Sequence, residues 1–162
     1  MWVIRRPATG GVPGQKVRLK IRSSSGQIKA LTQGIHPGLL VLYEGHFAGV
    51  NIEPYNIQVA MYGLETFDLA VPESGPPYLL GARHGPRQKM TQQDNTSISA
   101  IATLQRLHTG QIIFAVYHNK YAAVPLPLAI FAQYRVHQFT LWQPEASTFP
   151  RGKLYANTEL LS

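Results

Sequence analysis

The chain has 162 residues, which is enough for one hydrophobic core of ordinary size and too few for two comfortable domains. It contains no cysteine, which excludes disulfides, cysteine-bound zinc, iron–sulfur clusters and thiol nucleophiles. Hydrophobic residues make up 44% of the sequence and charged residues only 14%, so much of the surface must be uncharged or covered by neighbouring subunits. This composition favours a protein that assembles with others.

Positive and negative residues are separated along the chain. Residues 1–29 contain lysines and arginines but no acidic residue, whereas residues 30–82 contain aspartates and glutamates but no lysine or arginine. The formal net charge is +7, and basic character returns after residue 82. This distribution predicts that the amino-terminal region faces a negatively charged partner.

The first fourteen residues are rich in glycine and proline, which predicts an arm outside the core. Trp2, Val3 and Ile4 are too apolar for a solvated tail, and we interpret them as an assembly anchor that docks on this protein or on a neighbour. No apolar segment follows the early arginines, so no signal peptide is expected. The longest later apolar stretch, residues 121–132, contains prolines and is too short to be a transmembrane segment.

Residues 15–23 have the clearest periodic pattern in the chain. Val17, Leu19 and Ile21 alternate with cations, which predicts a strand with one apolar face and one basic face. The cations of this basic stripe are Lys16, Arg18, Lys20 and Arg22. Along a strand they would lie about 7 Å apart, a spacing that suits the phosphates of a nucleic acid or the headgroups of an anionic membrane. The alternative is a solvated edge strand whose cations prevent aggregation.

Further short apolar runs, separated by glycine, proline and asparagine, predict more strands. Their ranges are 27–32, 39–44, 46–52, 57–62, 66–71, 111–118, 121–124 and 131–142. Residues 97–108 place apolar side chains at three-residue intervals between cap-like residues, which predicts one short helix. Residues 72–96 interrupt the rhythm with prolines and glycines, and this predicts a long contact loop.

The long loop contains a second group of cations, the basic loop cluster of Arg83, Arg87 and Lys89. This cluster either extends the predicted positive surface or is an ordinary solvated loop. The segment matches no phosphate-binding loop, because the glycine spacing and the terminal Lys-Ser or Lys-Thr are missing.

No pattern in the chain predicts catalysis. The histidines are scattered singly, without the spacing of a zinc site, and nothing near Glu65 and Asp68 supports acid–base chemistry. No serine lies in a Gly-x-Ser-x-Gly motif. We therefore expect no catalytic residue, no metal ligand and no cofactor, and a protein that is not an enzyme.

Together these patterns predict an all-β, mainly antiparallel fold: a β-sandwich or jelly-roll barrel with one short helix and irregular terminal arms. The predicted organisation is an N-terminal arm at 1–14, a single β domain at 15–142 and a C-terminal arm at 143–162. We interpret the aromatic residues of the later strands as core and subunit contacts rather than as a stacking platform for bases or sugars.

In its strand pattern and terminal arms, the chain resembles the small single-barrel capsid proteins of icosahedral viruses, including those of tailless bacterial viruses with an internal membrane. The resemblance implies a structural shell subunit of the virion that self-assembles as a homo-oligomer or assembles with a second shell protein. It also implies that the basic stripe faces an anionic lipid membrane or the packaged nucleic acid.

Two other functions remain open, with a cytoplasmic rather than a virion location. In a nucleic-acid-binding β-barrel, the basic stripe and the basic loop cluster would form one electrostatic groove. A carbohydrate-binding or other ligand-binding β module is the third possibility.

Overall fold

The computed structural model describes residues 12–44, 53–106, 109–134, 136–141 and 155–161. Helices and strands both contribute to this part of the chain, so the prediction of an all-β antiparallel sandwich or barrel is wrong. In chain order the elements are α1 (Gln15–Thr32), β1 (Leu39–Glu44), α2 (Pro54–Tyr62), β2 (Glu65–Ala70), β3 (Tyr78–His84), β4 (Ala100–Arg106), β5 (Ile112–His118), the 3-10 helix η1 (Leu128–Phe131), β6 (Val136–Leu141) and β7 (Tyr155–Leu161).

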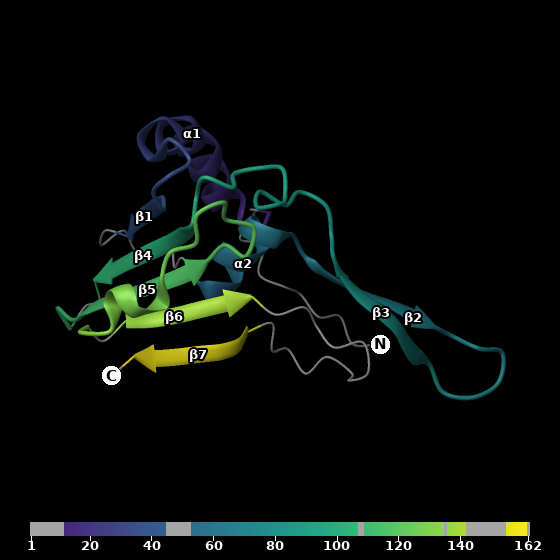
Figure 1. Ribbon diagram of the computed structural model, residues 1–162. Coiled ribbons are helices and arrows are strands. Elements are labelled where there is room, and N and C mark those ends of the chain that lie inside the picture. The colour runs from purple at the N-terminus through teal and green to yellow at the C-terminus, as the bar shows by residue number, and fades with distance from the viewer. Residues whose placement is uncertain (1–11, 45–52, 107–108, 135, 142–154, 162) are drawn as a thin grey trace.

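The strands form two separate sheets (Figure 1). The larger is an open sheet with the order β1-β4-β5-β6-β7, in which β1 pairs with β4 and β5 with β6 in parallel, while β4–β5 and β6–β7 are antiparallel. The smaller sheet is the antiparallel pair of β2 and β3, which we call the ribbon. Within the described residues β1 and β7 are therefore free edges, and no barrel closes.

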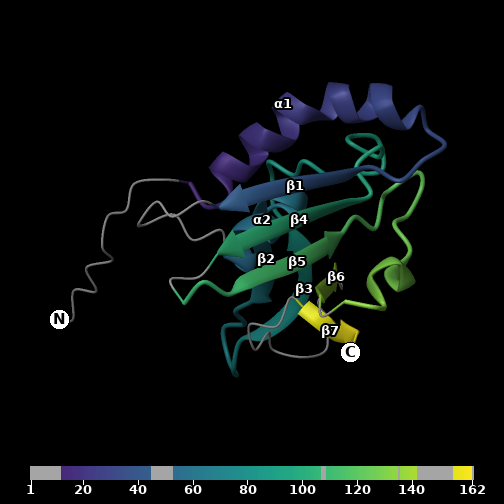
Figure 2. The same ribbon diagram turned by 90° about the vertical axis from the view of Figure 1, so that its left-hand side faces the viewer.

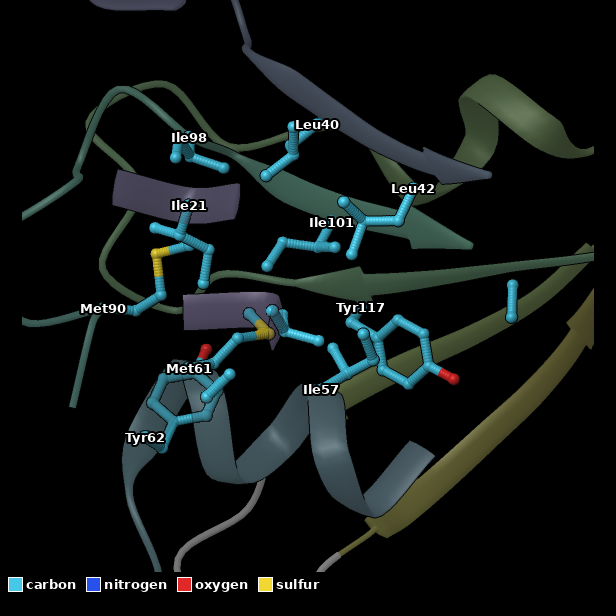
Figure 3. Close-up of a cluster of buried hydrophobic side chains, with 13 residues drawn as sticks. Ile21, Leu40, Leu42, Ile57, Met61, Tyr62, Met90, Ile98, Ile101 and Tyr117 are labelled. Atoms are coloured by element: carbon cyan, nitrogen blue, oxygen red, sulfur yellow. The ribbon is translucent and has the colours of Figure 1, made fainter. Parts of the chain in front are cut away.

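The open sheet is covered on both faces, by helices on one and by a loop on the other. Side chains of α1, α2, β1, β4 and β5 make the larger core, and Figure 3 shows them meeting between the sheet and α2. The smaller core contains Ala102, Val116, Leu126 and Val136, with Phe131 of η1 packed against it. Apolar area is therefore removed from water on both faces of the sheet, which stabilises the fold.

Helix α1 replaces two predicted strands, at 15–23 and 27–32. Its inward side carries Val17, Ile21 and Ile28, which recur at intervals of four and seven residues and so share one face of a helix. Leu19, which completed the apparent alternation, is 57% exposed. The helical period of the apolar residues is therefore recognisable only when the sequence beyond residue 23 is included.

Local contacts explain how α1 tolerates the serines and glycine that suggested a turn. The hydroxyls of Ser23 and Ser25 donate to the carbonyls three residues earlier, so both side chains bond within the helix. At the start of the helix, Gly14 has φ of +73°, and its N–H donates to Asn56 Oδ1 at 3.1 Å. A side chain on Gly14 would meet the backbone of α2, so this glycine permits the close packing of the two helices.

Helix α2 replaces the strand predicted at 57–62, and β4 replaces the helix predicted at 97–108. Helix α2 begins with Pro54, whose fixed φ suits the first helical turn. From Ile57 to Tyr62 every residue is buried, so no apolar face alternates with a polar one to reveal the helical period. Strand β4 lies between β1 and β5 and is also buried on both faces at its start. Burial on all sides removes the periodic signal that distinguishes a helix from a strand.

Other predicted strands agree with the structure. The ranges 39–44, 66–71 and 111–118 correspond to β1, β2 and β5. The predicted strand at 131–142 contains the shorter β6. The strand predicted at 46–52 lies outside the described residues, because residues 45–52 are not described.

Three further segments differ from the prediction. Residues 121–124 lie in the loop between β5 and η1 instead of forming a strand. Strand β3 occupies part of the predicted contact loop at 72–96, and β7 occupies part of the predicted C-terminal arm at 143–162. No helix among the described residues combines the length and hydropathy of a membrane span.

Candidate interaction surfaces

The ribbon extends away from the open sheet, with its turn at residues 71–77 far from the body (Figure 1). Its base is held firmly. The N–H of Gly85 donates to the carbonyl of Leu64, and the N–H groups of Lys89 and Met90 both donate to the carbonyl of Met61. The ribbon is therefore attached to the end of α2 at one end and free at the other.

An aromatic and cationic cluster reinforces this base. The hydroxyl of Tyr62 donates to the carbonyl of His118 and accepts from the N–H of Lys120, both at 3.1 Å. The Lys120 ammonium lies 4.7 Å from the ring centre of Tyr121 and 5.7 Å from that of Tyr62. The ring of His84 lies 5.8 Å from that of Tyr62. These contacts join α2, β3 and the loop after β5 into one packed unit.

Burial shifts the pKa values of two residues in this cluster. Burial raises the pKa of Tyr62 above its ordinary range, so this phenol stays protonated. Burial, followed by the positive charge of Lys120, lowers the pKa of His84. Both ring nitrogens of His84 are inaccessible to solvent and have no hydrogen-bond partner among the described residues. The hydroxyl of Tyr62 is engaged by backbone groups and its ring contacts His84, so the cluster is held together by packing and backbone hydrogen bonds.

Beyond its base, the ribbon exposes apolar side chains on both strands. Leu69 is 48% exposed, Tyr78 56%, Leu80 61% and, just after β2, Val71 is 78% exposed. Asp68 and Arg83 form an ion pair at 3.2 Å on the ribbon, and both side chains are exposed. The ribbon thus presents a mixed surface of large apolar groups and one pair of opposite charges, typical of a contact surface.

The residues of the basic stripe lie on α1, not on a strand, and the structure separates one of them from the others. Lys16, Lys20 and Arg22 are exposed. Arg18 is buried: its guanidinium donates to the carbonyl of Pro13 at 2.8 Å and to that of Val59 at 3.5 Å. Arg18 therefore holds α1 to α2 and takes no part in an exposed basic surface.

The three cations of the basic loop cluster have different surroundings. Arg83 is paired with Asp68 on the ribbon. Arg87 lies near Arg18, and its positive charge, after burial, lowers the pKa of that guanidinium. Lys89 is anchored through its backbone to α2. Arg83 thus lies on the ribbon, Arg87 near α1 and Lys89 beside the end of α2.

Helix α1 lies alongside β1 (Figure 2). A groove of about 1060 Å³ is lined by residues of these two elements. Lys16, Leu19 and Lys20 line it from α1, and Val41 and Tyr43 line it from β1. It combines an apolar strand edge with cations along one helix. The alternation in residues 15–23 predicted a strand, and a strand there gives no indication of a groove between a helix and β1.

Other predicted features have no counterpart in the described structure. The assembly anchor of Trp2, Val3 and Ile4 lies outside the described residues. Within the described residues, no three His, Asp or Glu side chains gather in a way that could hold a metal ion. Comparisons with protein-family models, with curated proteins and with solved structures found no match.

Sequence reasoning missed the ribbon as a surface. A usable signal was present, because apolar residues continue on both sides of the turn sequence Val71-Pro72-Glu73-Ser74-Gly75-Pro76-Pro77. Two apolar runs flanking a proline- and glycine-rich turn are typical of a hairpin. Treating the whole of 72–96 as a loop concealed it.

Proposed function

We propose that this protein acts by binding rather than by catalysis, as an assembly subunit whose ribbon pairs with the ribbon of a second copy. The observation that carries the proposal is the projection of the ribbon with large apolar side chains exposed on both strands. A two-stranded antiparallel ribbon without a third strand or a packed layer is marginally stable in water. A partner that covers it removes apolar area from water and supplies that layer.

The surface of the ribbon supports a second copy as the partner. A two-fold interface brings the same patch of both subunits together, so the patch must complement itself. Asp68 and Arg83 meet this requirement, because the carboxylate of one copy can pair with the guanidinium of the other. Leu69 and Leu80 are exposed on the same ribbon and provide apolar area for such a contact.

A shell subunit of a virion, alone or with a second shell protein, is one form that such assembly takes, and the low proportion of charged residues suits it. The expectation of a shell subunit was based on a jelly-roll barrel, and the open mixed sheet is not a barrel. The proposal therefore depends on the ribbon alone. We also propose that the protein is located in a virion, with the cytoplasm as the alternative location.

The test is the concentration dependence of mass in solution, measured by sedimentation velocity or light scattering. We expect the wild type to self-associate and the Leu69→Ser, Leu80→Ser double variant to do so about 100-fold more weakly, at about tenfold for each substituted position counted over both copies. The matched control is the Leu31→Ser, Ile35→Ser double variant, because both residues are exposed near the end of α1 and away from the ribbon. A wild type that stays monomeric at every concentration, or a control that dissociates as much as the ribbon variant, contradicts the proposal.

A further inference from the structure

We propose that the groove between α1 and β1 binds an extended acidic peptide segment, which adds to the free edge of β1 as a sixth strand of the open sheet. This binding site is separate from the ribbon. Three observations carry the inference: the unpaired edge of β1, the cations of α1 beside it, and the apolar side chains exposed along the strand.

The backbone of β1 offers hydrogen bonds on its outer side. The N–H of Ala100 donates to the carbonyl of Gly38, which places Gly38 among the residues whose backbone groups point toward β4. Backbone groups alternate between the two sides of a parallel strand, so those of Leu40 and Leu42 also point toward β4. Those of Leu39, Val41 and Tyr43 therefore point outward, where no described strand pairs with them. Unpaired strand edges of this kind accept an added strand.

The side chains around this edge specify the peptide. Lys16 and Lys20 lie one helical turn apart on the α1 wall of the groove, about 6 Å, which is close to the spacing of alternate residues in a strand. An added strand thus presents every second side chain toward these cations, and acidic residues suit those positions. Its other side chains lie beside Val41 and Tyr43, which are 49% and 64% exposed, and apolar residues suit them.

The strand edge favours a peptide over a nucleic acid. The two lysines by themselves could bind the phosphates of a nucleic acid as well as the carboxylates of a peptide, and a base could stack on the ring of Tyr43. A nucleic acid, however, leaves the outward N–H and C=O groups of β1 without the regular partners that a peptide backbone provides. Charge complementarity then selects an acidic peptide, because among the described residues no acidic side chain lines the groove.

The test uses a fluorescent eight-residue peptide of alternating valine and glutamate, with binding followed by anisotropy over a salt series. Wild type is expected to bind it, to bind the block-ordered peptide of the same composition less, and to bind the valine–lysine peptide not at all. The Lys16→Glu, Lys20→Glu variant should bind the acidic peptide at least about tenfold more weakly. The ribbon double variant, Leu69→Ser with Leu80→Ser, should bind it as the wild type does, which separates this site from self-association.

A proline distinguishes strand addition from simple charge attraction. Val41→Pro removes an outward N–H while the bonds toward β4 remain, and Val41→Ala keeps that N–H with a similar loss of side chain. We expect affinity to fall about tenfold in Val41→Pro relative to Val41→Ala. Should the proline variant unfold in a thermal melt, a peptide methylated at its backbone nitrogens makes the same test on wild type, and it is expected not to bind.

Three results overturn the inference. One is the absence of binding to the acidic peptide at millimolar concentration. Another is equal affinity of Val41→Pro and Val41→Ala, or full affinity of the methylated peptide. The third is tighter binding of single-stranded DNA or of anionic phosphatidylserine vesicles that depends on Lys16 and Lys20 but not on the N–H of Val41, which would assign the groove to phosphate groups.

Discussion

Strand β4 and the ribbon both consist largely of apolar residues, yet the fold uses them in opposite ways. Ala100, Ile101 and Ala102 of β4 are fully buried between two strands and two covering layers. Tyr78 and Leu80 of the ribbon are more than half exposed. The proportion of apolar residues in a strand therefore does not show whether the strand belongs to the core. The comparison indicates that β4 carries stability, whereas the surface of the ribbon is available for binding.

The largest expected effect is on β4. Ile101→Ala should lower the free energy of unfolding by about 2–5 kcal/mol, because it leaves a cavity in the larger core. Leu80→Ala, the matched change on the ribbon, should alter it by less than about 0.5 kcal/mol at a concentration where the chain is monomeric. Urea unfolding of both variants measures the difference. Equal losses of stability would show that the ribbon belongs to the cooperative core.

A charged residue of the body should also matter more than an apolar residue of the ribbon. Arg18→Met removes the charge-assisted hydrogen bonds to the carbonyls of Pro13 and Val59 that join α1 to α2, and their loss should cost about 1–3 kcal/mol. Arg22→Met, four residues along the same helix, changes an exposed side chain and should cost less than about 0.5 kcal/mol. Thermal or urea unfolding gives both values, and similar values for the two variants contradict a structural role for Arg18.

The smallest effect concerns pH and the base of the ribbon. Burial lowers the pKa of both His84 and His118 in the folded state, so the unfolded chain binds protons first as the pH falls. Stability is therefore fully present above about pH 6.5, the ordinary pKa of histidine, and decreases as the pH falls from 6.5 through the lower folded values. The slope should not exceed about 1.4 kcal/mol per pH unit for each histidine.

His84→Phe tests this pH dependence directly. Neither ring nitrogen of His84 has a partner among the described residues, so a phenyl ring should replace the imidazole without loss of stability near neutral pH. Urea midpoints measured between pH 5 and 8 should fall less steeply in this variant than in wild type. An unchanged slope means that His84 does not contribute to the acid sensitivity.

The same comparison explains how far the sequence could predict the fold. Short apolar runs bounded by turn residues correctly located β1, β2 and β5, because each is a separate strand with a clear beginning and end. Strand β4 and helix α2 were misassigned because burial on all sides erases the period that separates the two structures. Helix α1 was misassigned because alternation over 15–23 mimicked a strand.

The candidate surfaces were harder to predict than the strands. Sequence reasoning singled out Lys16, Lys20 and Arg22, and the structure exposes them, but it also grouped Arg18 with them. Whether a cation on a helix points outward or into a neighbouring helix depends on packing that no local pattern records. Likewise, the exposure of Leu80 follows from the absence of a covering layer among the described elements, which is a property of tertiary structure.

Self-association through the ribbon can be measured most directly by cross-linking, because the natural chain has no cysteine. Leu80→Cys places a single thiol on the ribbon, and Leu31→Cys places one at an exposed position on α1. Under mild oxidation, the ribbon pairing predicts a disulfide-linked dimer of Leu80→Cys that forms much faster than that of Leu31→Cys and stays at the dimer size. Equal, slow cross-linking of the two variants would show that the ribbons do not meet and would contradict the proposed assembly.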